Sequence, residues 1–162
     1  MEKKFYWNLF GVVVFVSMVV FVSIVYSHCQ IPCGIYDDPA RFDELSEHIL
    51  TIEKSMLQIT ELSKEDKPDM NQLVRWIQNK DEHADQLSHI VTYYFMAQRV
   101  KPVERTDGKK YNEYVEKLTL LHEMLVYSMK AKQTTDLANV EKLRSSLSKF
   151  HKAYFPQHTH ND

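Results

Sequence analysis

The stretch from Phe42 to Ile59 reads FDELSEHILTIEKSMLQI, and its pattern decides the fold class. Its apolar residues recur at alternating steps of three and four, a spacing that places them on one face of an α-helix: Phe42, Leu45, Ile49, Ile52, Met56 and Ile59. Just before this stripe, Asp38 suits an N-cap and Pro39 suits the first helical position. The segment SKEDKPD at 63–69 contains Pro68 and ends the predicted helix.

Three further segments show the same periodicity. The second runs from about Asp69 to Val100, and its stripe is Leu73, Ile77, Lys80, Ala84, Leu87, Val91 and Tyr94. After breaks at Pro102 and at Asp107-Gly108, the third runs from about Lys109 to Lys132 with Tyr111, Tyr114, Leu118, Leu121 and Leu125. A candidate cap at 134–136 introduces the fourth, with Val140, Leu143, Leu147, Phe150 and Tyr154. We therefore expect an all-α fold: an antiparallel up-down-up-down four-helix bundle over residues 37–162, with a short C-terminal tail.

Two segments are more apolar than a single buried stripe requires. They read VTYYFMA at 91–97 and LTLLHEMLV at 118–126. A second apolar face is explained either by a wide core or by another protein surface that covers it. We favour the second explanation, a homo-oligomer.

The composition excludes several classes of protein. Only 3 glycines and 5 prolines occur in 162 residues, which argues against a loop-rich, all-β or collagen-like chain. The net charge is −2, and the charged residues are interspersed in sign without a basic stripe. A nucleic-acid partner is therefore not expected.

Residues 1–27 have the features of a cleaved signal peptide. Lys3 and Lys4 precede an uncharged run of about 17 residues, and Val25 and Ser27 fit the −3 and −1 positions of signal peptidase. Cleavage after Ser27 would export the protein, to the periplasm or the medium, with His28 as its new N-terminus. The alternative is an uncleaved membrane anchor, because such a run is at the lower limit for crossing a bilayer.

The segment His28 to Tyr36 reads HCQIPCGIY and holds both cysteines of the chain. The spacing of Cys29 and Cys33 is neither that of a C-x-x-C redox pair nor that of a haem-attachment motif. A disulfide is the ordinary expectation for an exported protein. A bridge between residues four apart would constrain little of the unfolded chain, so it would stabilise the bundle poorly.

A free N-terminus at His28 would make this segment a chelator. An α-amine has a pKa near ~7.7–8.0, so a metal displaces its proton far more easily than that of a lysine. The amine and imidazole of His28, the backbone amide and thiolate of Cys29, and the thiolate of Cys33 are then within reach of one ion. Pro32 bends the chain and Gly34 permits a tight turn, which returns Cys33 to the site. Square-planar nitrogen and sulfur donors suit nickel or copper(II).

The motif resembles the nickel hook of nickel-containing superoxide dismutases, whose pattern is H-C-x-x-P-C-G-x-Y. The resemblance implies a four-helix bundle assembled as a homohexamer, superoxide as substrate and a nickel ion as cofactor. It implies nickel ligation by the His28 amine, the Cys29 amide nitrogen and the thiolates of Cys29 and Cys33, with the His28 imidazole as axial ligand in the oxidised state. Tyr36 matches the tyrosine at the mouth of the family's site, and Pro32 matches a proline that follows a cis bond.

Glu44 falls at the family's spacing for a carboxylate that orients the metal-bound imidazole, the role that outer hydrogen-bond partners play at metal sites. An exposed glutamate stabilised by the dipole of its helix is the alternative. Two departures from the family are visible. Gln30 replaces the usual acid, and we find no arginine in the second helix at the depth where the family has one. Lys80 or His83 are possible replacements, although a snorkelling lysine and a surface histidine are the ordinary interpretations.

We expect the other histidines to be solvated, including His158 and His160 in the tail. The sequence thus predicts an exported nickel superoxide dismutase with 1–27 as leader, 28–36 as nickel hook and 37–162 as helical domain. The protein would contact the membrane only through its leader, before the leader is cleaved. The alternative is a membrane-anchored helical interaction or sensor module with a Cys29–Cys33 disulfide.

Overall fold

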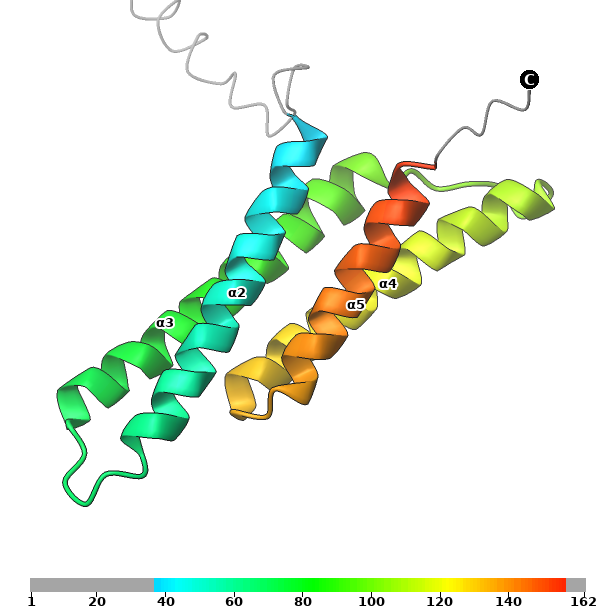
Figure 1. The fold of residues 1–162 in the computed structure, drawn as a ribbon. Helices are drawn as coiled ribbons and strands as arrows, with labels where there is room; N and C mark the ends of the chain where they lie inside the picture. The colour runs from blue at the N-terminus through cyan, green and yellow to red at the C-terminus, as the bar shows by residue number, and fades with distance from the viewer. Residues whose placement is uncertain (1–36, 157–162) are drawn as a thin grey trace, which may run out of the picture. The chain divides into compact units, whose positions relative to one another are not determined.

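The computed structural model describes residues 37–156, which contain helices and no strand. The elements are α2 (Asp38–Leu62), α3 (Met70–His89), the π-helix η1 (Ile90–Arg99), α4 (Gly108–Gln133) and α5 (Ala138–Tyr154). Because η1 continues α3 directly, residues 37–156 form four helical rods, and consecutive rods run in opposite directions (Figure 1). Each rod packs on two others: α2 on α3 and α5, and α4 on α3 and α5. The prediction of an all-α helical bundle is confirmed.

The core follows the stripes of α2 and α5 closely. All six predicted residues of α2 are buried, from Phe42 at 4 % exposure to Ile59 at 8 %. In α5 the buried apolar residues are Val140, Leu143, Leu147 and Phe150. Burying a large apolar side chain contributes roughly 1.5–3 kcal/mol, so these two stripes are a main source of the stability of the bundle.

The stripes predicted for the second and third helices are only partly right. Ile77 is 40 % exposed, because the hairpin of α2 and α3 extends beyond the turn that joins α4 to α5 (Figure 1). On α4 the buried face is centred on Leu121 and Met124 and continues to Ala131. Tyr111, Tyr114, Leu118 and Leu125 are only half-buried at its margins. Periodicity places residues on one face, but the neighbouring helices decide which margin of that face is covered.

Of the two caps expected from the sequence, the one at Asp38 is displaced by one residue, and the one at 134–136 is found through Asp136. Asp37, not Asp38, occupies the N-cap position of α2, and its side chain makes no capping hydrogen bond. Asp38 is the first helical residue and uses its carboxylate elsewhere, as described below. The Asp69 side chain caps α3, and Asp136 accepts the Ala138 N–H at the start of α5.

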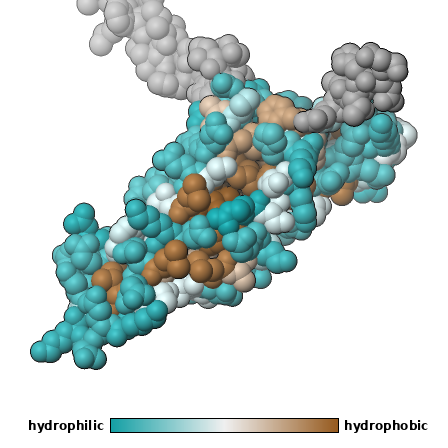
Figure 2. Space-filling view, in the orientation of Figure 1, coloured by the Kyte–Doolittle hydropathy of each residue, from teal (hydrophilic) through white to brown (hydrophobic). Residues whose placement is uncertain are grey.

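The two strongly apolar segments mostly line a wide core. Val91 and Phe95 of η1 and Leu121 of α4 are fully buried, whereas Tyr93 is 51 % exposed and Val126 is 37 % exposed. The surface of the bundle is polar with apolar residues exposed among the polar ones, and Figure 2 shows such residues along the middle of one face. Core lining therefore accounts for most of the extra hydrophobicity, and a smaller exposed remainder is left.

Candidate metal centre

Most of the predicted site lies outside the described residues. This holds for the leader, for the candidate ligands His28, Cys29 and Cys33, and for Pro32 and Tyr36. It also holds for the tail histidines His158 and His160. Glu44, Lys80 and His83 lie within residues 37–156, so their surroundings can be examined.

Residues 37–156 do hold an arginine close to the start of α2. Tyr36 is followed by Asp37 and then by α2. The carboxylate of Asp38 forms an ion pair with Arg99, whose Nη2 lies 2.9 Å from Oδ1. Arg99 is the last residue of η1 and belongs to the second helical rod. The sequence did not reveal this arginine because its position depends on the wider turns of a π-helix.

Glu44 lies on the second turn of α2 with a side chain that is 39 % exposed. Its carboxylate forms an ion pair with Arg41, one turn earlier on the same helix. An ion pair within one turn of a helix is typically worth a few tenths of a kcal/mol, roughly 0.3–0.5. Such a weak local contact leaves the carboxylate available for a stronger partner. Its proposed role toward His28 stays a prediction.

The expectation that the remaining histidines are solvated is wrong for His48. This residue is 7 % exposed, and its Nδ1 lies 2.9 Å from Nδ1 of His83 on α3. One ring must donate and the other must accept, so the pair shares a proton. Burial and the proximity of His83 lower the pKa of His48, although Glu44 and Glu47 oppose this. Its Nε2 is buried and has no hydrogen-bond partner among residues 37–156.

Lys80 is not a snorkelling lysine, because the residue is 3 % exposed. Its ammonium donates to the carbonyls of Ala131 at 2.8 Å and Lys132 at 2.5 Å, and to the carboxylate of Asp81 at 2.9 Å. Lys80 thus satisfies carbonyls in the last turn of α4, where a helix favours a cation. It lies 19 positions before Arg99 along the second helical rod. The contacts of Lys80 thus give it a structural role, and the replacement of the family's arginine by Lys80 or His83 stays a prediction.

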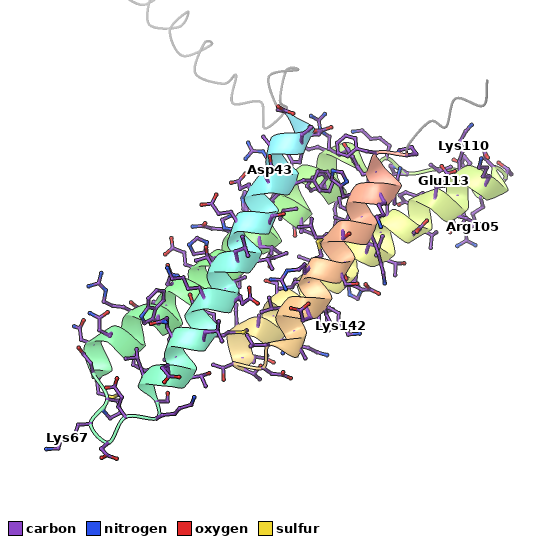
Figure 3. The ribbon with its side chains drawn as sticks, in the orientation of Figure 1. Asp43, Lys67, Arg105, Lys110, Glu113 and Lys142 are labelled. Atoms are coloured by element: carbon purple, nitrogen blue, oxygen red, sulfur yellow. The ribbon has the colours of Figure 1, made fainter. Side chains whose placement is uncertain are left out.

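A basic pocket of about 200 Å³ opens beside Arg99 and Tyr154. Its lining includes Lys101, Lys110 and Lys117, with Glu113 as the acidic member. Figure 3 shows Lys110 and Glu113 near the start of α4. The Lys110 ammonium lies 2.8 Å from Asp107, and the Lys117 ammonium lies 6.0 Å from the centre of the Tyr154 ring. Two of the lining cations, Arg99 and Lys110, are paired with the carboxylates of Asp38 and Asp107.

Two further structural findings concern residues 37–156 alone. No three histidine, cysteine, aspartate or glutamate side chains in this range are grouped closely enough to hold a metal ion. None of its helices combines the length and the apolar character that a membrane-crossing segment needs. The predicted ligands and the leader lie outside residues 37–156.

Comparison with known proteins identifies the family. The sequence profile described as nickel-containing superoxide dismutase matches residues 23–158, which include HCQIPCGIY and all four helical rods. No curated protein and no solved structure matches the chain. The profile match confirms the predictions of an enzyme and of a nickel cofactor, and it gives no support to the alternative of a membrane-anchored interaction module. The chain therefore belongs to the family of nickel-containing superoxide dismutases, oxidoreductases with a nickel cofactor.

Proposed function

We propose that the mature chain begins at His28 and disproportionates superoxide to oxygen and hydrogen peroxide at a nickel hook formed by residues 28–36. The observation that carries this proposal is the motif HCQIPCGIY, which lies at a predicted cleavage site and inside the matched range of 23–158. The described helical domain follows the motif directly and begins at Asp38.

The donor set of the segment fits nickel. The amine and imidazole of His28, the amide nitrogen of Cys29 and the thiolates of Cys29 and Cys33 combine nitrogen with soft sulfur donors, the combination that suits nickel(II). Held by His28, Cys29 and Cys33, nickel would supply a one-electron couple between Ni(III) and Ni(II), the chemistry that the disproportionation of superoxide requires. Anionic thiolate and amide donors would stabilise the higher charge of Ni(III). They would thereby bring the reduction potential of the couple into the range that the reaction with superoxide needs.

The protein residues must also supply protons, since two superoxide ions and two protons yield one oxygen and one hydrogen peroxide. Tyr36 is the last residue of the hook in the sequence, and we propose that it supplies protons together with ordered water and backbone amides. Glu44 would orient the His28 imidazole, as outer hydrogen-bond partners do at many metal sites. Because the ion pair of Glu44 within the described helices is a local one, with Arg41, this role would not require the loss of a strong contact among residues 37–156.

Attraction of the superoxide anion would be local. After removal of residues 1–27 the chain keeps 18 basic and 21 acidic residues, a net charge of −3, so its global field does not favour an anion. The basic pocket with Lys101 and Lys117 lies beside Arg99, which contacts the first residue of α2. Lys101 and Lys117 of this pocket would attract the anion locally.

The proposal includes export and a homohexamer. Export follows from the leader pattern, and the hexamer from the family resemblance. The exposed Tyr93 and Val126 are apolar surface that an interface between copies would cover.

Intact mass and elemental analysis of the native protein test the proposal. We expect a chain that starts at His28, carries nickel and accelerates superoxide decay. Active protein that retains Met1 would contradict the proposal, because the His28 nitrogen would then be a peptide nitrogen and not an amine.

A further inference from the structure

Four side chains from three elements meet at the first residue of α2, and we call them the Asp38 cluster: Asp38, Tyr94, Arg99 and Tyr154. Oδ1 of Asp38 accepts a hydrogen bond from the Tyr94 hydroxyl, and Oδ2 accepts one from the Tyr154 hydroxyl at 2.8 Å. The guanidinium of Arg99 lies 2.9 Å from Oδ1 and also donates to the Tyr94 hydroxyl at 3.0 Å. The cluster thus ties the start of α2 to the ends of η1 and α5.

The cluster is more than a surface ion pair. Its Asp38 and Arg99 side chains are only 24 % and 26 % exposed. Burial acts to raise the pKa of Asp38, but the two tyrosine hydroxyls and Arg99 together hold it below its ordinary value. Burial and the bond to Asp38 raise the pKa of Tyr154. Both observations describe a carboxylate that stays ionised because donors surround it.

An aromatic layer fixes the tyrosine rings. The Tyr154 ring lies 5.5 Å from Phe42, 5.6 Å from Phe95 and 5.5 Å from Phe150, measured between ring centres. Tyr94 contacts Phe95 edge to face at 5.0 Å. Rings packed in this way hold their hydroxyls in place, so the bonds to Asp38 require little further ordering.

The π-helix brings Tyr94 and Arg99 together. Residues five apart lie on different faces of an α-helix, whereas a π-helix brings them close to one another along its axis. The guanidinium of Arg99 accordingly lies 5.0 Å from the centre of the Tyr94 ring, and the Val100 N–H bonds the Phe95 carbonyl at 2.8 Å. Such local departures from the α-helix are found often at functional sites.

The start of α2 depends on this cluster. Its N-cap residue, Asp37, forms no side-chain capping bond, so the first turn lacks the usual local support. The buried Nε of Arg99 has no hydrogen-bond partner among residues 37–156. Tyr36, the last residue of the proposed hook, precedes Asp38 by two positions.

We propose that the Asp38 cluster is the anchor of the nickel hook: Asp38, Tyr94, Arg99 and Tyr154 are positioning residues that hold the first turn of α2, the turn that follows residues 28–36 in the sequence. This inference rests on the proposed function. A short segment with two thiolates and a terminal amine binds metal well only if the end that joins the bundle is held in place. An unrestrained end would give the metal-free state more conformational entropy, which metal binding would have to remove. The anchor therefore acts on nickel retention without touching nickel.

The test compares two variants of the chain that starts at His28. Tyr94→Phe combined with Tyr154→Phe removes both hydroxyls and keeps the aromatic layer. Lys80→Met is the matched control, because it removes a buried polar contact at the C-terminal end of α4, remote from the Asp38 cluster along the second rod. Measurements are the rate of nickel release to a chelator, the electron paramagnetic resonance spectrum of the oxidised protein, and amide hydrogen exchange in the first turn of α2 without metal.

We expect the tyrosine variant to release nickel about tenfold faster, as the loss of hydrogen bonds to a charged group implies. We also expect an altered resonance spectrum and faster exchange in the first turn of α2. The control should match wild type in all three measurements, even if its melting temperature falls as far as that of the tyrosine variant. If the tyrosine variant matches the control in all three measurements, the Asp38 cluster is not the anchor of the hook, and the proposed function is unaffected. Wild-type protein that neither binds nickel nor dismutates would overturn the proposed function.

Discussion

At the residue scale, buried polar side chains show where the bundle departs from a simple apolar core. Lys80 and His48 both occupy buried positions, yet they differ in how well they are satisfied. The Lys80 ammonium has two carbonyl acceptors and a carboxylate, whereas Nε2 of His48 has no partner among residues 37–156. The first residue should therefore stabilise the fold, and the second should make its stability depend on pH.

Replacing Lys80 with methionine should lower the free energy of unfolding by about 1–3 kcal/mol. The substitution keeps the length of the side chain but leaves the carbonyls of Ala131 and Lys132 without their donor. Urea unfolding followed by circular dichroism measures the change. Lys142→Met on the exposed surface of α5 is the control and should change stability by less than about 0.5 kcal/mol. Equal stability of the two variants would show that the buried ammonium contributes nothing.

The stability of the protein should fall as the pH is lowered from 7 to 5. Burial and His83 lower the pKa of His48, so below the ordinary histidine value the unfolded chain binds a proton that the folded chain refuses. Stability is therefore complete above that value and declines as the pH falls toward the folded pKa. His48→Gln should flatten this part of the profile, while His122→Gln at an exposed position should not. Identical profiles for all three proteins would refute the role of His48.

At the scale of elements, η1 joins the hydrophobic core to the Asp38 cluster. Phe95 is fully buried and contacts Phe42 and Phe150 at 5.0 Å, while Tyr94 and Arg99 of the same helix reach Asp38. One segment thus contributes both an aromatic core residue and the donors that hold the start of α2. The neighbouring Tyr93 is 51 % exposed, which provides an internal comparison.

Phe95→Ala should destabilise the fold by about 3–5 kcal/mol, since it removes a large buried ring and leaves a cavity between α2, η1 and α5. Tyr93→Ala, two positions earlier, should cost about 0.5 kcal/mol or less. Thermal and urea unfolding of both variants measure the difference. A small loss for Phe95→Ala would mean that the aromatic layer repacks easily, and the argument for fixed tyrosine rings would fail with it.

At the scale of the whole molecule, the bundle and the hook are separate in sequence and should be separable in their effects. Cys29→Ser and Cys33→Ser should each abolish nickel-dependent dismutation while the helix content stays at the wild-type level, because residues 28–36 precede α2 and both thiolates are proposed ligands. Gln30→Ser, in the same segment, should keep its activity. Activity assays and circular dichroism on nickel-reconstituted proteins give the comparison. A cysteine variant with wild-type activity would rule out thiolate ligation at that position.

The sequence predicted those features that depend on neighbours along the chain. The stripe from Phe42 to Ile59 is a local pattern, as is the motif HCQIPCGIY, and each could be recognised from spacing alone. The contact between His48 and His83 and the contact between Asp38 and Arg99 depend on how antiparallel rods align. The second contact also requires the wider turns of η1, for which the sequence IVTYYFMAQR carries no distinct periodic signal. Lys80 was visible as the odd member of a stripe, but its acceptors on α4 were not.

The central claim is that the free amine at His28 makes this segment a nickel site. The most direct measurement is stopped-flow superoxide decay, with nickel content determined in parallel, on the chain that starts at His28 and on the same chain preceded by one alanine. The extension keeps every side chain but converts the His28 amine into a peptide nitrogen, so the chelate rings no longer close on the same atoms. We expect rapid decay for the first protein and loss of redox activity for the second. Decay at the same rate in both proteins would contradict it.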